Sequence, residues 1–323
     1  MNYGPMMIDI EGPELLEEET NLLKHPRVGG VLLFTRNYRD KQTLKKLVSE
    51  LRKAAEHPIL IAVDNEGGRL WRFRESFTHI EAAREYGLLY DKDPEAAKKW
   101  AEKNGYIMAK ELLDVGIDIS LAPVLDLDFG VSEVIGDRAF HRKPEVVTQL
   151  AAAFVEGMHR AGMAATGKHF PGHGAIAMDS HLKEAIDHRT FEAILKEDLV
   201  PFFELKHQLN AIMPAHVIYP CVDNVPAGFS KDWLQEILRQ KFQYQGAIIS
   251  DCMSMEGAGI GGDFVLRSRM ALDAGCDMVI LTQQDRDTLL WVLDKLDRNI
   301  SKESQLRLAA LASQGIKIQK TPA

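Results

Sequence analysis

Short apolar segments rich in β-branched residues alternate with longer segments of helical period along almost the whole chain. This alternation is typical of a parallel sheet in which each strand is followed by a covering helix. We predict eight strands, at residues 5–9, 30–34, 59–64, 117–123, 163–169, 211–215, 247–251 and 277–281. A doubly wound sheet usually has fewer strands and a glycine-rich fingerprint after the first one, so eight units in 323 residues favour a barrel. The predicted fold is α/β, a single-domain (β/α)8 TIM barrel over residues 1–316, with a short C-terminal tail at residues 317–323.

The helix predicted between the third and fourth strands has the clearest start and stop signals. Asp93 can cap its first turn, Pro94 suits its first position, and Gly116 suits the left-handed residue after its end. The residues between them place a mostly apolar stripe on one face: Ala97, Trp100, Ala101, Asn104, Met108 and Leu112. Gly162 and Gly275 repeat this ending before the fifth and eighth strands, so we expect equivalent units.

Charge and cysteine content restrict the class of partner and the compartment. The chain has 39 Lys and Arg against 47 Asp and Glu, a net charge of −8, and no run of basic residues, which disfavours nucleic acid. No apolar run reaches the length of a membrane span, so no membrane partner is expected. The 3 cysteines show no CxxC spacing, which favours a reducing compartment. We predict a cytoplasmic monomer without a cofactor, since no nucleotide-binding GxGxxG motif follows the first predicted strand and the chain has no GxxxxGK[ST] motif.

Polar side chains gather where the predicted strands end. The third strand ends in Asp64 with Glu66 two residues later, and the fourth runs into Asp126. Lys168 is near the end of the fifth strand, His216 follows the sixth, and Asp251 ends the seventh. Catalytic groups of a barrel lie at the carboxyl ends of its strands, so these side chains are expected to meet in one site. Structural interpretations remain open: Asp64 could form a loop ion pair with Arg69, and His216 could be a satisfied core histidine. The ammonium of Lys168 is harder to explain in this way, because a barrel interior seldom holds one without a partner.

The segment after the fifth strand contains three histidines and is the most informative part of the sequence. His169 and His173 would bind zinc from one face only in a helix, which Pro171 and Gly172 disfavour. Asp179 and His181 stand two residues apart, so in an extended segment they point the same way. A carboxylate beside an imidazole orients it and raises its pKa, which suits general acid/base catalysis. A solvent-exposed Asp–His pair is the structural alternative.

Taken together, four segments resemble family 3 glycoside hydrolases: 63–69 (VDNEGGR), 168–174 (KHFPGHG), 179–181 (DSH) and 250–251 (SD). The resemblance extends along the whole chain, and the four segments occur in the order found in the family. In its single-domain length and its Asp-Ser-His segment, the chain resembles the bacterial β-N-acetylglucosaminidases of peptidoglycan recycling. This resemblance implies a glycosidase that removes terminal N-acetylglucosamine from 1,6-anhydro-N-acetylmuramic acid, with or without its peptide.

The resemblance also implies the role of each site residue. Asp251 would be the nucleophile that forms a covalent glycosyl-enzyme, His181 the acid and later the base, and Asp179 the residue that orients His181. The sugar would be held by five residues: Asp64, Arg72, Arg138, Lys168 and His169. Cys252 and Met253 follow the nucleophile where an Asp-Leu pair is commoner, and this departure removes no catalytic atom.

Two other functions remain open at this point. A metal-dependent barrel hydrolase would use four ligands, His169, His181, His216 and Asp251, but it would be expected to have a His-x-His on its first strand, where residues 7–11 contain no histidine. A sugar-binding barrel without turnover would not need the intact Asp179, His181 and Asp251. We further predict that the loop at residues 172–180 is mobile without ligand, because glycines flank it.

Overall fold

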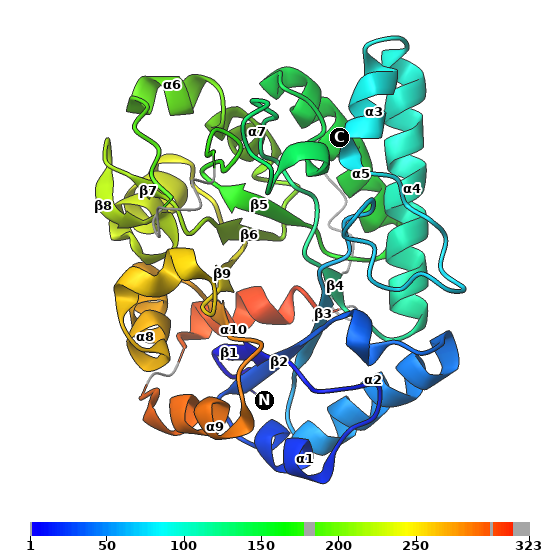
Figure 1. Cartoon of the computed structure of the whole chain (residues 1–323), viewed down its shortest axis with the longest axis vertical. Coiled ribbons are helices and arrows are strands. Elements are labelled where there is room, and N and C mark those ends of the chain that lie inside the picture. The colour runs from blue at the N-terminus through cyan, green and yellow to red at the C-terminus, as the bar shows by residue number, and fades with distance from the viewer. Residues whose placement is uncertain (1, 178–184, 298–299, 313–323) are drawn as a thin grey trace.

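Eight parallel strands form one sheet that curves into a barrel (Figure 1). The structure is a computed structural model that describes residues 2–177, 185–297 and 300–312. The sheet order is β4-β3-β2-β1-β10-β9-β6-β5, and hydrogen bonds from Thr166 N to Ala122 O (2.8 Å) and from Leu125 N to Lys168 O (2.6 Å) join its two ends. The strands are β1 (Met6–Ile8), β2 (Val28–Leu33), β3 (Leu60–Val63), β4 (Ile119–Ser120), β5 (Thr166–Phe170), β6 (Ala211–Pro214), β9 (Ala247–Cys252) and β10 (Met278–Ile280). The predicted (β/α)8 barrel is confirmed, and all eight predicted strands overlap observed ones.

Helices connect the strands and cover the outside of the barrel (Figure 1). They are α1 (Glu17–Leu23), α2 (Lys41–Ala55), α3 (Ala83–Tyr90), α4 (Pro94–Asp114), α5 (Pro144–Ala161), α6 (Phe191–Lys196), α7 (Leu199–Leu205), α8 (Phe264–Ala274), α9 (Arg286–Lys295) and α10 (Lys302–Ala309). A π-helix, η4 (Asp232–Lys241), connects β6 to β9, and short 3₁₀ turns are η1 (Thr35–Asn37), η2 (Gly136–Arg138), η3 (Ala227–Phe229) and η5 (Glu256–Gly261). A small antiparallel hairpin, β7 (Ile218–Tyr219) and β8 (Asp223–Pro226), follows β6.

Helix α4 begins and ends as the sequence predicts. The Asp93 carboxylate accepts a hydrogen bond from Ala96 N at 3.0 Å, and Pro94 is the first helical residue. The predicted stripe is buried apart from Trp100, which is half-buried. Gly162 and Gly275 end α5 and α8 with φ of +95° and +119°, a conformation that residues with a Cβ rarely adopt.

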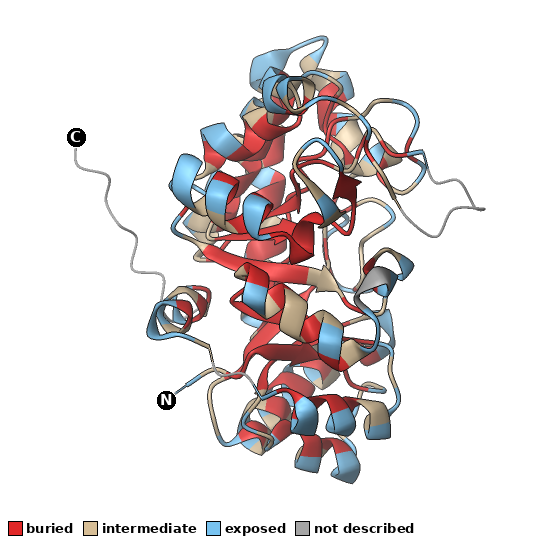
Figure 2. Ribbon diagram, turned by 90° about the vertical axis from the view of Figure 1, so that its left-hand side faces the viewer, coloured by how far each residue is buried: buried red, intermediate tan, exposed pale blue. Residues whose placement is uncertain are grey.

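The strands carry apolar side chains on both faces. In β3, Leu60 and Ala62 point into the barrel interior, whereas Ile61 and Val63 pack against the surrounding helices. Figure 2 shows the same arrangement as a buried centre with exposed outer helix surfaces. Burial on both faces explains why these strands appear in the sequence as continuous apolar runs rather than as alternating ones.

Two buried aspartates occupy equivalent places at the amino-terminal end of the barrel. Asp118 accepts a hydrogen bond from Ile61 N (2.8 Å) and pairs with Arg52 (2.7 Å). Asp277 pairs with Arg239 at 3.1 Å and accepts a backbone N–H of β9 in the same way. Each carboxylate thus joins a strand to a neighbouring helix, a structural role at the end of the barrel opposite the strand ends that carry the predicted site.

Candidate functional site

A cavity of about 300 Å³ lies at the carboxyl ends of the barrel strands. Its lining includes Asp64 after β3, Lys168 and His169 in β5, and Asp251 in β9. Arg138 reaches it from η2, and apolar side chains of the barrel interior bound it on another side. The structure therefore brings the predicted nucleophile together with four of the five predicted sugar-binding residues.

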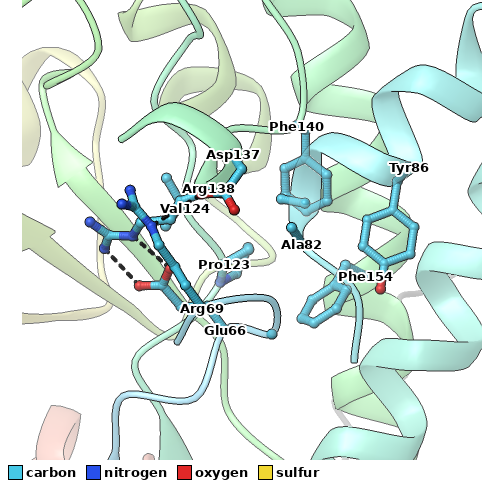
Figure 3. Close-up of a pocket in the computed structure, with 12 residues that line it drawn as sticks. Glu66, Arg69, Ala82, Tyr86, Pro123, Val124, Asp137, Arg138, Phe140 and Phe154 are labelled. Carbon is cyan, nitrogen blue, oxygen red and sulfur yellow. Dashed lines mark hydrogen bonds and ion pairs between the residues drawn. The ribbon is translucent and has the colours of Figure 1, made fainter. Parts of the chain in front are cut away.

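Lys168 is at the centre of an ion cluster in the wall of this cavity. Its side chain is 2% exposed, and its Nζ lies 2.5 Å from Asp64 Oδ1 and 2.5 Å from Glu66 Oε1. Arg138 holds Glu66 with two parallel hydrogen bonds of 2.8 Å, drawn as dashed lines in Figure 3. The partners that a buried ammonium requires are thus two carboxylates from the β3 loop.

The fifth predicted residue, Arg72, stands behind Asp64. Its Nη2 lies 3.3 Å from Asp64 Oδ2, and its backbone N–H donates to Asn65 Oδ1 at 2.8 Å. The alternative ion pair of Asp64 with Arg69 is wrong, because Arg69 pairs with Asp137 at 3.1 Å. A tight turn, closed by a hydrogen bond from Leu70 N to Gly67 O at 3.0 Å, carries Arg69 away from Asp64.

Burial and ion pairing act in opposite directions on the cluster. Burial alone would lower the pKa of the Lys168 ammonium, but the charges of Asp64 and Glu66 raise it above its ordinary value. Burial alone would raise the pKa of the Glu66 carboxyl, but Lys168 and Arg138 hold it well below its usual range. Both groups are therefore charged across the neutral pH range, ready to form charge-assisted hydrogen bonds.

His169 is oriented by a carboxylate that the sequence analysis did not assign. Asp126, which is 1% exposed, accepts hydrogen bonds from His169 Nδ1 at 2.7 Å and from His173 N at 2.7 Å. His169 and Asp126 are thus a buried pair, and His169 lines the cavity. The neighbouring His173 also lines the cavity, and burial and the charge of His169 lower its pKa.

Asp251 and Cys252 are half-buried at the end of β9. Asp251 Oδ1 accepts the backbone N–H of Cys252 at 2.7 Å, which fixes one side of the carboxylate. The Cys252 thiol lies 3.0 Å from Ser254 Oγ and 3.1 Å from Thr282 Oγ1. His216 is 4% exposed with Nε2 at 3.1 Å from Cys252 O, so it is a core histidine that packs beneath this strand end.

Two predicted catalytic residues, Asp179 and His181, lie outside the described residues. The part of the 172–180 loop after residue 177 and the predicted tail at residues 317–323 also lie outside them. Among residues 2–177, 185–297 and 300–312, no three His, Cys, Asp or Glu side chains converge as metal ligands would. Within the same residues, no helix combines the length and the apolar character needed to cross a membrane.

The sequence places Glu66 and Asp126 among the polar residues at strand ends but assigns neither of them a role in the site. Glu66 stands two positions after Asp64. Side chains two residues apart in an extended segment point the same way, so this spacing could have placed Glu66 beside Asp64. Asp126 follows the fourth strand in the region where polar strand-end residues are expected. Both act on other side chains, and such a role depends on contacts between loops that are distant in sequence.

A second buried ion network lies beside the site. Arg189 donates to Asp187 Oδ2 at 2.6 Å and to Asp198 Oδ2 at 2.7 Å, and both carboxylates are almost fully buried. Close by, the Tyr219 hydroxyl donates to Gly172 O at 2.6 Å. Arg189 and Gly172 belong to the two ends of the segment that joins β5 to α6. The contacts therefore fix one end to the start of α7 and the other to the β7–β8 hairpin.

The burial of Asp198 makes the stability of the fold depend on pH. Burial raises the pKa of Asp198 to about 6, so between its unfolded value and about 6 the folded state binds the proton more tightly. Stability then falls as the pH rises through this window, and it levels off above. We expect the Asp198→Asn variant to gain about 2 to 3 kcal/mol relative to the parent between pH 4 and pH 7.

Urea unfolding of the two proteins at several pH values checks this expectation. Asp285→Asn is the control, because the backbone N–H of Thr288 lowers the pKa of this exposed carboxyl and its contribution is lost as the pH falls. A stability difference between Asp198→Asn and the parent that stays constant from pH 4 to pH 7 would contradict the assignment.

The fold and the cavity define a (β/α)8 barrel whose strand ends present the Asp251 carboxylate together with a group of cations and an imidazole. Residues 6–311 match the N-terminal domain of glycosyl hydrolase family 3. The chain belongs to glycosyl hydrolase family 3. The prediction of a glycoside hydrolase on this barrel is confirmed.

Relatives of known name are similar along nearly the whole chain. A β-hexosaminidase of Methylobacillus flagellatus is 49% identical over 96% of this chain and 89% of that protein. A β-hexosaminidase of Tolumonas auensis is 52% identical over 91% of this chain and 86% of that protein. The crystal structure of NagZ from Neisseria gonorrhoeae in complex with N-trifluoroacetyl-D-glucosamine has a TM-score of 0.91 and 40% identity, and the match covers 97% of this chain and 91% of that one. The predicted resemblance to family 3 β-N-acetylglucosaminidases is therefore confirmed.

Proposed function

We propose that this protein is a retaining exo-β-N-acetylglucosaminidase that removes terminal N-acetylglucosamine from 1,6-anhydro-N-acetylmuramic acid and its peptides. We expect it to act as a cytoplasmic monomer in peptidoglycan recycling, without a cofactor. The observation that carries this proposal is the cavity that unites Asp251 with Asp64, Arg138, Lys168 and His169. The β-hexosaminidase relatives and the NagZ structure with a bound glucosamine derivative support the choice of sugar.

The shape of the cavity favours attack at a chain end. Its wall includes Leu32, Met213 and Ile280, which belong to the side-chain cluster inside the barrel. A cavity that ends in the barrel core holds a terminal sugar and gives the rest of the chain no exit on that side. This geometry fits the release of one monosaccharide at a time.

In the proposed mechanism, Asp251 attacks the anomeric carbon and forms a covalent glycosyl-enzyme. His181 protonates the leaving oxygen, oriented by Asp179, and then activates the water that releases the sugar. The usual pair in such enzymes is two carboxylates, and a histidine acid departs from it. Five residues would hold the sugar: Asp64, Arg72, Arg138, Lys168 and His169.

The hydroxyl and acetamido groups of the sugar need both donors and acceptors. Lys168 and Arg138 offer charged N–H donors, and Asp64 offers carboxylate acceptors beside them. Asp64 is the more accessible of the two carboxylates around Lys168, with 21% of its side chain exposed against 7% for Glu66. Asp64 is therefore the carboxylate expected to contact the sugar.

A nitrophenol release assay tests the proposal. We expect the protein to hydrolyse 4-nitrophenyl β-N-acetylglucosaminide at neutral pH, to retain this activity in EDTA, and to leave 4-nitrophenyl β-glucoside largely intact. Mass spectrometry should then detect N-acetylglucosamine released from its disaccharide with 1,6-anhydro-N-acetylmuramic acid. Preference for the glucoside, or loss of activity in EDTA, would overturn the proposal.

A further inference from the structure

The ion cluster consists of Lys168, Asp64, Glu66 and Arg138. Glu66 binds both cations of this cluster. Its side chain is 7% exposed, and it contacts Lys168 Nζ at 2.5 Å and the Arg138 guanidinium at 2.8 Å through two hydrogen bonds. Lys168 and Arg138 line the cavity, whereas Glu66 does not. The carboxylate therefore lies behind two cations that face the cavity.

Aromatic rings lie near Glu66 on the side away from the substrate cavity. Figure 3 shows the Glu66–Arg138 pair across a small cavity from the rings of Tyr86, Phe140 and Phe154. The small cavity has a volume of about 20 Å³, and all three rings are at most 2% exposed. Charges beside such an apolar wall interact more strongly than charges in water, which strengthens the pairing of Glu66 with Arg138.

The Glu66 carboxylate offsets the repulsion between the two cations. The charge of Arg138 lowers the pKa of Lys168, while Asp64 and Glu66 raise it. Other charged or titratable groups also face Glu66, Lys168 and Arg138. Arg72 pairs with Asp64, and Asp126 acts on Arg138. Arg69 and Asp137 line the small cavity, and His169 and Asp251 line the larger one. Removal of the Glu66 charge would leave Asp64 alone to balance Lys168, with Arg138 unpaired beside it.

We propose that Glu66 is a positioning residue that holds Lys168 and Arg138 in the arrangement that binds the sugar. It acts through these two side chains and makes no contact with the substrate. This inference rests on the proposed function, because Lys168 and Arg138 are assigned to the sugar there.

The Glu66→Gln variant tests this inference, because it keeps the size of the side chain and removes its charge. We expect kcat/KM for 4-nitrophenyl β-N-acetylglucosaminide to fall about 100-fold, mainly through a higher KM, since two binding groups are displaced. We also expect the alkaline limb of the kcat/KM profile to move to lower pH. Lys168 would lose one of two neighbouring negative charges, so its pKa would fall toward the assay range.

Two further variants separate positioning from a merely structural role. Glu66→Asp keeps the charge with a shorter reach, so we expect its alkaline limb to match the parent while kcat/KM stays at least about tenfold lower. Asp277→Asn removes a buried, arginine-paired carboxylate at the opposite end of the barrel, so it should lower stability without moving the pH profile. If Glu66→Gln does not fold, Glu66→Asp carries the test.

Calorimetric titration with N-acetylglucosamine runs beside the kinetics. Weaker binding to Glu66→Gln than to the parent supports the inference. A parent protein that does not hydrolyse the nitrophenyl substrate would overturn only the proposed function, and the binding result would still stand. Equal binding and an unmoved alkaline limb in Glu66→Gln overturn the inference while leaving the proposed function intact. A shifted alkaline limb in Glu66→Asp or in Asp277→Asn would also overturn it.

Discussion

The Asp251→Ala variant is expected to lose at least about 10⁴-fold in kcat/KM for 4-nitrophenyl β-N-acetylglucosaminide. Cleavage passes through an oxocarbenium-like state, which needs a negative charge and a nucleophile on one face of the sugar. Asp251 is at the end of β9 in the cavity wall, and the Cys252 N–H fixes one of its oxygens. Alanine supplies neither the charge nor the nucleophile, so the first step has no substitute within reach.

Two measurements distinguish loss of the nucleophile from damage to the cavity. Cys252→Ala changes the adjacent side chain in the same wall and should keep kcat/KM within about tenfold of the parent. With azide added, the Asp251→Ala variant should yield the α-glycosyl azide, because the small anion enters the space that the carboxylate left. Activity within about tenfold of the parent in Asp251→Ala would show that another residue is the nucleophile.

The barrel could be predicted from the sequence because its strands are buried on both faces. In β3, Leu60 and Ala62 fill the interior while Ile61 and Val63 meet the helices, so the run is apolar throughout. Start and stop signals such as Asp93 and the glycine after α5 then separate the units. The bounds differ by a few residues because strand ends depend on hydrogen bonds to neighbours rather than on local composition.

The site could be predicted only as far as the barrel determines it. Strand order brings Asp64, Lys168 and Asp251 together, so position at a strand end was sufficient to find them. The pairing of Asp64 with Arg69 failed because the turn closed by Leu70 N and Gly67 O reverses the chain. Side chains that hold other side chains, such as Glu66, depend on contacts between separate loops, and no local pattern specifies those contacts.

The Arg189→Ala variant is expected to be destabilised by about 3 to 5 kcal/mol. Arg189 pairs with Asp187 and Asp198, whose side chains are 3% and 0% exposed. The pairing contributes less than its geometry suggests, because burial of the charges is costly, and this cost explains why the pKa of Asp198 is raised despite the arginine. Removal of the cation leaves two carboxylates close together without a counter-charge, which costs more than the pair contributes.

Urea unfolding at pH 7 measures this loss, and Arg142→Ala is a matched control. Arg142 stacks on the same ring as Arg189, that of Phe129, at 4.0 Å and pairs with Glu197 at 2.8 Å, but its side chain is 43% exposed. An exposed pair of this kind contributes about 1 kcal/mol or less, so the control should be nearly as stable as the parent.

The double variant Arg189→Ala/Asp198→Asn should recover part of the loss, because it removes one of the two unpaired charges. If Arg189→Ala were no less stable than Arg142→Ala, the two aspartates would have to reach water or share a proton, and the network would not be what fixes the Arg189 end of the β5–α6 segment.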